Sequence, residues 1–110
     1  MVVLVNEESA SAAEIVSGAI RDKKTGTLVG VKTFGKGIVQ TIFPLDGGTS
    51  VKLTTAKYLT PNKTDIHKIG IEPDIKVELP KGKDATLLPT DANFDPQLLK
   101  AVQTLQEKIK

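Results

Sequence analysis

Four consecutive apolar residues, Val2 to Val5, follow Met1 directly at the start of the chain. A continuous apolar run of this length predicts a strand that is buried on both faces, in the centre of a sheet. Because a chain rarely starts inside a central strand, we expect this sequence to be part of something longer. A second short apolar segment, Thr27 to Gly30, predicts another buried strand.

Between these two strands, apolar residues recur at the three- and four-residue spacing of a helix, which we expect to end near Asp22. They are Ala12, Ile15, Val16, Ala19 and Ile20. Ser11 and Glu14 fit a capping box, so Ser11 marks the start of this helix. Gly26, after two lysines, is the residue that we expect to end it in left-handed geometry.

The middle of the chain predicts a β-hairpin. Residues 38–45 and 49–59 are rich in β-branched side chains, which favour strands. Asp46, Gly47 and Gly48 between them form a strong hairpin signal.

The last third of the chain predicts a short edge strand, Ile75 to Leu79, and a final helix. Residues 80–94 show no periodicity and predict a linker. Asp95 can cap the helix over residues 95–110, and Pro96 suits its first position. The helix carries one apolar stripe that should dock on the sheet or on another part of a larger protein. The stripe comprises Leu98, Leu99, Val102, Leu105 and Ile109. The whole pattern predicts an α/β fold with a mixed sheet.

Composition narrows the function. With 110 residues the chain forms one domain at most. Its 15 basic residues are scattered and nearly balanced by 13 acids, so we expect no nucleic-acid partner. Without cysteine there is no disulfide, thiolate nucleophile or thiolate metal site. The chain has no apolar run of 18 residues, and its first run is too short for a signal peptide, so we expect a soluble chain without a targeting signal.

Two local patterns argue against common site types. Residues 30–37 match a phosphate-binding loop except at Gly37, which replaces the hydroxyl that would ligate magnesium, and a strand follows where that loop needs a helix. His67 is the only histidine, so neither a Ser-His-Asp triad nor a multi-histidine metal site is expected. We therefore expect neither a bound nucleotide nor a metal.

A serine nucleophile without histidine can use lysine as its base. Ser11 would sit at a helix N-terminus, where the helix dipole and the Ala12 N–H favour a developing oxyanion. Lys36 lies between two glycines that let the backbone approach another segment closely. It must be neutral to act as a base, which requires burial among apolar groups. In the alternative interpretation, Ser11 is a helix cap and Lys36 a solvated turn residue.

Three segments together, residues 2–15, 33–40 and 53–61, closely resemble the C-terminal processing (tail-specific) serine proteases. The resemblance runs from Val2 to about Val77 and includes residues 70–74. It implies a fragment of a crotonase/Clp-protease-like protease core, with the partial catalytic core at 1–79, the linker at 80–94 and the helix at 95–110.

The resemblance also implies roles for individual residues. Ser11 corresponds to the nucleophile, with Ser9 as a neighbour. Lys36 corresponds to the general base, and Gln40 to the residue that orients it. The Ala12 N–H would form the oxyanion hole together with a glycine from an upstream segment. No cofactor or metal is implied.

This sequence departs from the family pattern in two ways. Ala13 stands where relatives often have a third serine, a small change. The upstream glycine segment and the PDZ domain that captures substrate tails are not in these 110 residues, so we expect the isolated chain to be inactive.

The resemblance implies that the whole protein binds C-terminal tails through that PDZ domain. It also implies that the protein works outside the cytoplasm, in a periplasm, at a cell surface or in an organelle lumen. Exposed sheet edges also lead us to expect a homodimer or an exchange of strands or helices between copies.

Two matters stay open from the sequence. A non-catalytic folding or protein-interaction module is the alternative function. The geometry of Gln40 is the other matter, because four residues of extended strand span about 13 Å, whereas neighbours four apart on a helical turn lie about 5–6 Å apart. Contact between Gln40 and Lys36 would need a bulge or turn at Gly37.

Overall fold

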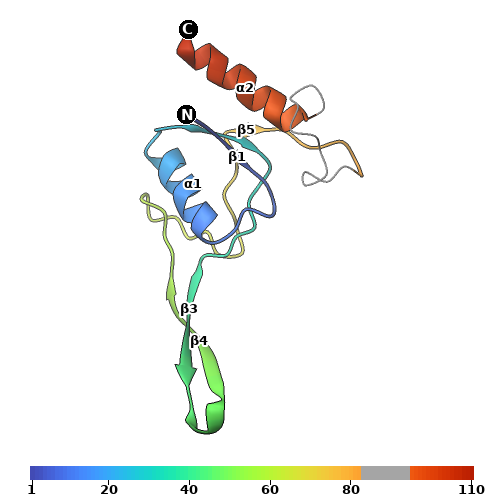
Figure 1. Ribbon diagram of the computed structural model, residues 1–110. Helices are drawn as coiled ribbons and strands as arrows, with labels where there is room; N and C mark the ends of the chain where they lie inside the picture. Colours follow the sequence, from blue (N-terminus) through green and yellow to red (C-terminus); the bar gives the residue numbers. More distant parts are fainter. Residues whose placement is uncertain (83–94) are drawn as a thin grey trace.

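Three parallel strands form the central sheet of the computed structural model, which describes residues 1–82 and 95–110 (Figure 1). They are β1 (Val2–Val5), β2 (Thr27–Gly30) and β5 (Ile75–Lys76), in the order β1-β2-β5. The middle strand β2 is the buried one, because both of its faces are covered by other elements. Its residues Leu28 and Val29 are completely shielded from solvent.

The prediction that β1 is buried on both faces is wrong. Within the described residues β1 is an edge strand, and Leu4 is 44% exposed while Val5 is buried. An apolar run alone does not reveal whether a strand lies at the centre or at the edge of its sheet.

The first helix, α1 (Ala12–Asp22), begins directly after Ser11, so its predicted start is confirmed. Its end at Asp22 is also as predicted, but the residue that takes left-handed geometry after it is not the expected one. Lys24, with φ 54°, takes the left-handed conformation instead of Gly26. Gly26 is needed for space, because a Cβ there would lie 2.8 Å from Ile20 Cγ2 and 3.2 Å from the Met1 carbonyl oxygen.

A small apolar core lies beneath β1 and β2. Val5 and Leu28 pack there with Ile66 and Ile71, which come from the loop before β5. The carboxylate of Asp74 anchors this loop by accepting the Leu28 N–H at 2.8 Å. Asp74 thereby holds the loop against β2, and it also lies 3.8 Å from Arg21 near the end of α1.

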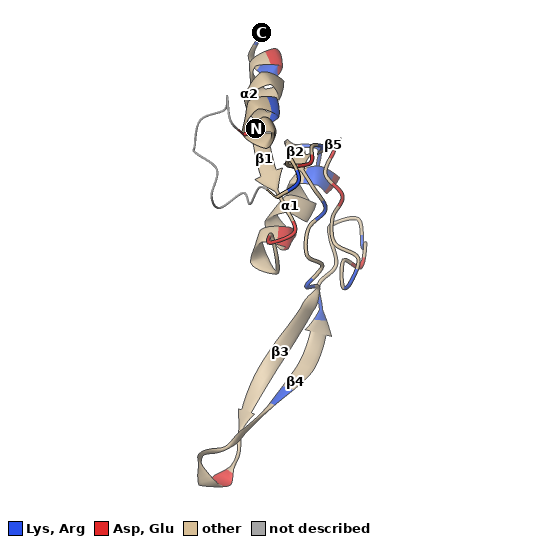
Figure 2. Cartoon of the chain, turned by 90° about the vertical axis from the view of Figure 1, so that its right-hand side faces the viewer, with Lys and Arg blue, Asp and Glu red and all other residues tan. Residues whose placement is uncertain are grey.

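The hairpin is confirmed, but it is not part of a mixed sheet. β3 (Ile38–Pro44) and β4 (Ser50–Lys57) pair only with each other among the described residues and project away from the core (Figure 1). The turn η1 (Asp46–Gly48) joins them. β3 carries no charged residue, whereas β4 carries Lys52 and Lys57, which account for the blue on β4 in Figure 2. Both faces of the hairpin are solvent-exposed for most of its length.

The second helix, α2 (Pro96–Ile109), starts as predicted. The Asp95 side chain caps it by accepting the N–H groups of Gln97 and Leu98 at 2.8 and 3.0 Å. The helix packs against β1 and β2, so the strands lie between α1 and α2 in Figure 1. Gln97 also donates to the Val77 carbonyl at 2.8 Å.

The face of α2 that packs on the sheet differs from the predicted apolar stripe. The residues buried there are Gln97, Ala101 and Thr104. Most of the apolar stripe is exposed instead, at Leu99, Val102, Leu105 and Ile109. The part of the predicted linker at residues 83–94 lies outside the described residues. In the described ranges, no helix combines the length and the apolar composition needed to cross a bilayer.

Candidate functional site

Ser11 occupies an unusual backbone conformation at the start of α1. Its φ and ψ are 55° and −114°, a region that L-residues other than glycine rarely enter. The hydrogen bonds of the turn hold it there, because its carbonyl accepts the N–H groups of Glu14 and Ile15 at 2.9 and 3.1 Å. Strain of this kind is typical of functional sites, and a sharp strand-to-helix turn is how hydrolases of another fold present a nucleophilic serine.

The carboxylate of Glu14 is the centre of the hydrogen-bond network around Ser11. Glu14 is completely buried, and its Oε2 accepts the Ser11 N–H at 3.0 Å. Its Oε1 accepts the Thr33 hydroxyl at 2.5 Å and the Gly35 N–H at 2.6 Å. Four donors in all satisfy this buried carboxylate, the fourth being the Lys36 N–H.

The two candidate catalytic residues meet at this carboxylate. The Lys36 N–H donates to Glu14 Oε2 at 2.8 Å, the same oxygen that accepts the Ser11 N–H at 3.0 Å. Their backbone nitrogens can therefore be no farther apart than those two bond lengths together. The structure thus brings Ser11 and Lys36 together through their main chains, although they are far apart in sequence.

The loop that carries Lys36 is held on both sides. The Phe34 N–H donates to the Ser9 carbonyl at 3.0 Å, which joins the loop to the segment before α1. The hydroxyl of Thr33 accepts the Ile71 N–H at 2.8 Å while it donates to Glu14. This loop is therefore fixed by contacts within the chain.

The likeness of residues 30–37 to a phosphate-binding loop has a physical explanation. The N–H groups of Gly35 and Lys36 do converge on an anion, as they would in such a loop. That anion is the Glu14 carboxylate of the same chain. The cradle is filled internally, which argues against a bound nucleotide there.

Ala12 offers a further donor beside the candidate nucleophile. Ala12 is the first residue of α1 and is exposed. Among residues 1–82 and 95–110 no acceptor is hydrogen-bonded to its N–H. Free N–H groups at a helix N-terminus are suited to binding negative charge.

The side chains of Lys36 and Gln40 are both exposed, unlike the buried carboxylate that holds the Lys36 main chain. In the described part of the chain no hydrogen bond joins these two side chains. The pairing of β3 with β4 does shift between Val39 and Gln40, but the extra residue is Thr55 on β4. This bulge lies beyond Gly37 and on the opposite strand, so it does not bring Gln40 back toward Lys36.

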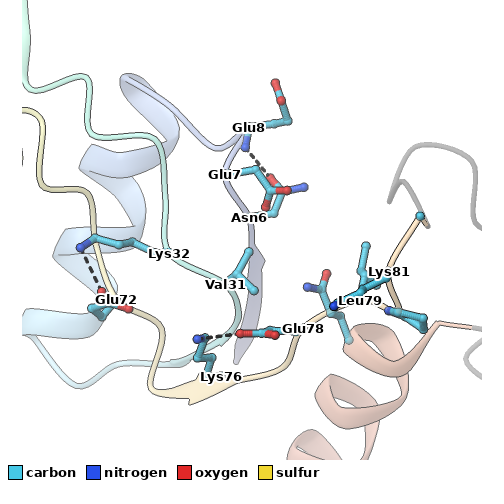
Figure 3. A pocket seen from close by; sticks show the side chains of 13 residues that line it. Asn6, Glu7, Glu8, Val31, Lys32, Glu72, Lys76, Glu78, Leu79 and Lys81 are labelled. Carbon is cyan, nitrogen blue, oxygen red and sulfur yellow. Dashed lines mark hydrogen bonds and ion pairs between the residues drawn. The ribbon is translucent and has the colours of Figure 1, made fainter.

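Two cavities flank this region. The larger one, about 780 Å³, lies between the loop at Asn6 and the segment after β5 (Figure 3). Its rim carries the ion pairs Lys32–Glu72 and Lys76–Glu78, at 3.0 and 2.7 Å, and it contains neither Ser11 nor Lys36. A smaller apolar cavity of about 260 Å³ lies between α1 and the end of β4.

The far end of α1 is fixed by a second carboxylate. Asp22 accepts the Asn62 N–H at 2.9 Å. Hydrogen bonds from the Thr60 hydroxyl and from this N–H lower the pKa of Asp22 below its ordinary value. Both ends of α1 are thus tied to loops that follow it in sequence.

No group of three His, Asp or Glu side chains that could hold an ion occurs in the ranges that the structure covers. His67 Nδ1 is buried without a hydrogen-bond partner among these residues. A lone imidazole nitrogen does not make a metal site.

The sequence predicts Ser11 and Lys36 as site residues but assigns Glu14 only to a helix cap. Two features of the sequence bear on the further role of Glu14. An acid follows Ser11 by three residues, and a glycine-rich segment around Lys36 resembles an anion cradle. Only the fold shows that the acid occupies the cradle.

Comparison with known proteins gives the relatives of this chain. The model of peptidase family S41 matches residues 1–77. The chain is 48% identical over 99 residues to a carboxyl-terminal-processing protease of Synechocystis sp., covering 89% of this chain and 23% of that protein. It is 47% identical over 93 residues to a carboxy-terminal processing protease of Bacillus subtilis, covering 84% and 20%. The chain therefore spans about a fifth of these relatives.

Two solved protease structures are similar to this chain. The photosystem II D1 C-terminal processing protease superposes with a TM-score of 0.70 at 42% identity, over 90% of this chain and 23% of that chain. The tricorn protease superposes with a TM-score of 0.69 at 24% identity, over 97% of this chain and 10% of that chain. The second likeness concerns the fold alone.

Proposed function

The chain belongs to peptidase family S41, and on that premise we propose that it is part of a longer serine endopeptidase that cleaves proteins near their C-termini. In this proposal the chain is a fragment of a crotonase/Clp-protease-like core. Ser11 is the nucleophile, Lys36 the general base and Gln40 the residue that positions Lys36. The Ala12 N–H is one donor of the oxyanion hole.

One observation carries the proposal. The strained Ser11 and the main chain of Lys36 are held by the same buried carboxylate oxygen of Glu14. A helix cap alone would not need a second loop bound to the same group. This arrangement supports the proposal, because it holds the backbones of Ser11 and Lys36 close together while the Lys36 side chain is exposed.

The proposed chemistry follows from these positions. Ser11 Oγ attacks the peptide carbonyl carbon while its proton passes to Lys36 Nζ. The negative charge on the carbonyl oxygen is stabilised by the Ala12 N–H and the positive end of α1. Lys36 then gives the proton to the departing amine, which leaves an ester on Ser11. Water hydrolyses this ester, with Lys36 again accepting and returning a proton.

Lys36 can act in this way only when its amine is neutral, and burial among apolar groups is the factor that favours the neutral form. In these 110 residues the Lys36 side chain is exposed. We therefore propose that the isolated chain lacks useful activity and that other parts of the whole protein cover Lys36.

Partners and location of the whole protein are part of the same proposal. A PDZ domain outside these residues would capture substrate tails, and the protein would work outside the cytoplasm. A chloroplastic C-terminal processing peptidase of Tetradesmus obliquus, 46% identical over 91 residues, supports such a location. For the isolated chain, the exposed edge of β1 supports pairing between copies.

The test is cleavage of an unstructured protein with an apolar tail by the complete protein that carries these residues. Ser11→Ala should abolish cleavage. Ser9→Ala is the matched control, because Ser9 lies two residues away and its hydroxyl bonds only to Asn6 among the described residues. Unchanged cleavage by the Ser11→Ala form would overturn the proposal and favour an interaction module. Cleavage by the isolated chain that depends on Ser11 would overturn the proposed inactivity.

A further inference from the structure

The loop that carries Lys36 lies against a turn at residues 66–70, which the chemistry described above does not use. A Cβ on Gly37 would lie 2.7 Å from the backbone nitrogen of His67 and 3.1 Å from its Cα. A Cβ does not approach a backbone atom as closely as 2.7 Å, so the loop and the turn meet backbone to backbone at this point.

The same kind of contact occurs on the other side of Lys36. A Cβ on Gly35 would lie 2.8 Å from the Gly70 nitrogen and 3.0 Å from the Ile69 nitrogen. Gly35 also has a φ of 90°, a left-handed backbone that favours glycine, so two reasons require glycine there. The φ of Gly37 is not positive, so the contact with the turn is the reason for glycine at that position.

Hydrogen bonds hold this contact on both sides of Lys36. The Lys68 N–H donates to the Gly35 carbonyl at 2.8 Å. The Tyr58 N–H donates to the Gly37 carbonyl, also at 2.8 Å. The N–H groups of Gly35 and Lys36 donate to the buried carboxylate on α1. The backbone from which the Lys36 side chain extends is therefore bonded to three separate segments.

Asp65 joins the turn to the end of β4. Its Oδ1 accepts the His67 N–H at 2.8 Å, and its Oδ2 accepts Lys57 Nζ at 3.1 Å. The hydrogen bond from the His67 N–H is the main reason that the pKa of Asp65 lies below its ordinary value. Lys57 is the last residue of β4, directly before the residue that bonds to the Gly37 carbonyl. Asp65 thus holds together the two segments that support Gly37.

We propose that Gly37 is a positioning residue for Lys36, and that Asp65 keeps the supporting turn in place. The inference rests on the proposed protease function and adds how that function positions its base. The Lys36 side chain is exposed, so the place of its backbone sets the region that its amine can reach. A misplacement of about 1 Å can slow a reaction about 100-fold.

The first experiment measures cleavage of an unstructured protein with an apolar tail by the complete protein that carries Gly37→Ala. The added methyl group forces the loop away from His67, so kcat should fall about 100-fold. KM should change little, because Lys36 acts in the chemical step. His67→Ala is the matched control. The contact uses the backbone of His67, which this change retains, so kcat should stay as it was.

A second measurement separates positioning from a general loss of structure. If Gly37 acts through Lys36, Gly37→Ala should cost nothing further once Lys36 is absent. The background is Lys36→Ala with ethylamine added as a replacement base, and there Gly37→Ala should change the rate by no more than about twofold. A damaged fold would lower this rate as strongly as it lowers the rate of the parent protein.

Asp65 gives an independent route if the thermal midpoint shows that Gly37→Ala does not fold. Asp65→Ala removes the acceptor of the His67 N–H and should lower kcat about tenfold. Asp65→Asn keeps an oxygen that can accept this N–H and should restore most of the activity. Lys57→Met removes only the exposed ion pair and should have little effect.

The outcomes separate the two proposals. If cleavage requires Ser11 but neither Gly37→Ala nor Asp65→Ala lowers kcat, the positioning inference is wrong and the protease function stands. The inference is also wrong if Gly37→Ala lowers the amine-restored rate as strongly as the parent rate. If no protein is cleaved in a manner that depends on Ser11, the protease function itself fails, and the positioning inference fails with it.

Discussion

The junction around Glu14 and the hairpin β3–β4 differ in how they are held. At the junction, α1 and the loop of Thr33 to Gly37 are joined by a buried carboxylate with four donors. The hairpin projects into solvent with Phe43, Val51 and Leu53 exposed, and its ladder pairs only with itself in the described ranges (Figure 1). An isolated two-stranded hairpin is marginally stable in water.

This contrast separates what the chain determines by itself from what it leaves to neighbours. The backbones of Ser11 and Lys36 are positioned by contacts within these residues. The side chains of Lys36 and Gln40 are exposed, so their surroundings depend on what packs against them. In the proposed function, these residues supply a fixed backbone frame, and the parts of the protease outside them would complete the surroundings of the Lys36 and Gln40 side chains.

Removing the carboxylate at the junction should have the largest effect. Glu14→Ala leaves four donors without their acceptor and should lower the free energy of unfolding by about 4 kcal/mol, enough to unfold a small domain of marginal stability. Urea denaturation of the 110-residue chain, followed by circular dichroism, measures it. Glu8→Ala, at an exposed position just before α1, should change stability little. Equal stability of the two variants would contradict the claim that the Glu14 carboxylate holds α1 and the loop of Thr33 to Gly37 together.

A matched pair of leucines compares the core with the hairpin directly. Leu28→Ala in the buried strand β2 should cost about 3 kcal/mol because it creates a cavity. Leu53→Ala on β4, where Leu53 is 52% exposed, should cost less than about 0.5 kcal/mol in the isolated chain. The same urea titration gives both values. A Leu53→Ala cost close to that of Leu28→Ala would show that the hairpin is packed against something in this chain.

The smallest expected effect concerns the far end of α1 and depends on pH. Hydrogen bonds from Thr60 and Asn62 lower the pKa of Asp22 in the folded chain, so ionised Asp22 adds stability above its unfolded pKa of about 3.9. That contribution is lost as pH falls through the lowered folded value. Asp22→Asn should therefore be less stable than the parent chain at pH 7 and close to it near pH 2. A stability difference that grows as pH falls would contradict the assigned cause.

The elements that the sequence predicts correctly carry local signals. The capping box at Ser11, the Asp46–Gly48 turn and the Asp95–Pro96 helix start each depend on residues within a few positions of one another. The errors concern long-range partners. An apolar run does not reveal that β1 is an edge, and helical spacing does not reveal that α2 buries Gln97, Ala101 and Thr104.

The candidate site shows the same difference between local signals and long-range partners. Ser11 and Lys36 could be chosen from their chemistry and from the family resemblance. The role of Glu14 could not, because it depends on a loop that folds back onto α1 from about twenty residues away. The relation of Gln40 to Lys36 depends on how the hairpin is packed, which lies beyond local geometry.

The most direct test of the central claim is chemical rescue of Lys36 in the complete protein. The account predicts that Lys36→Ala lowers kcat/KM for an unstructured substrate at least about 1,000-fold, within the range that positioned acid–base groups contribute. Added ethylamine should restore part of this loss, in proportion to its neutral form, and should restore nothing to Ser11→Ala. Full activity of Lys36→Ala without added amine would contradict the claim that Ser11 and Lys36, set side by side by Glu14, form the reactive pair.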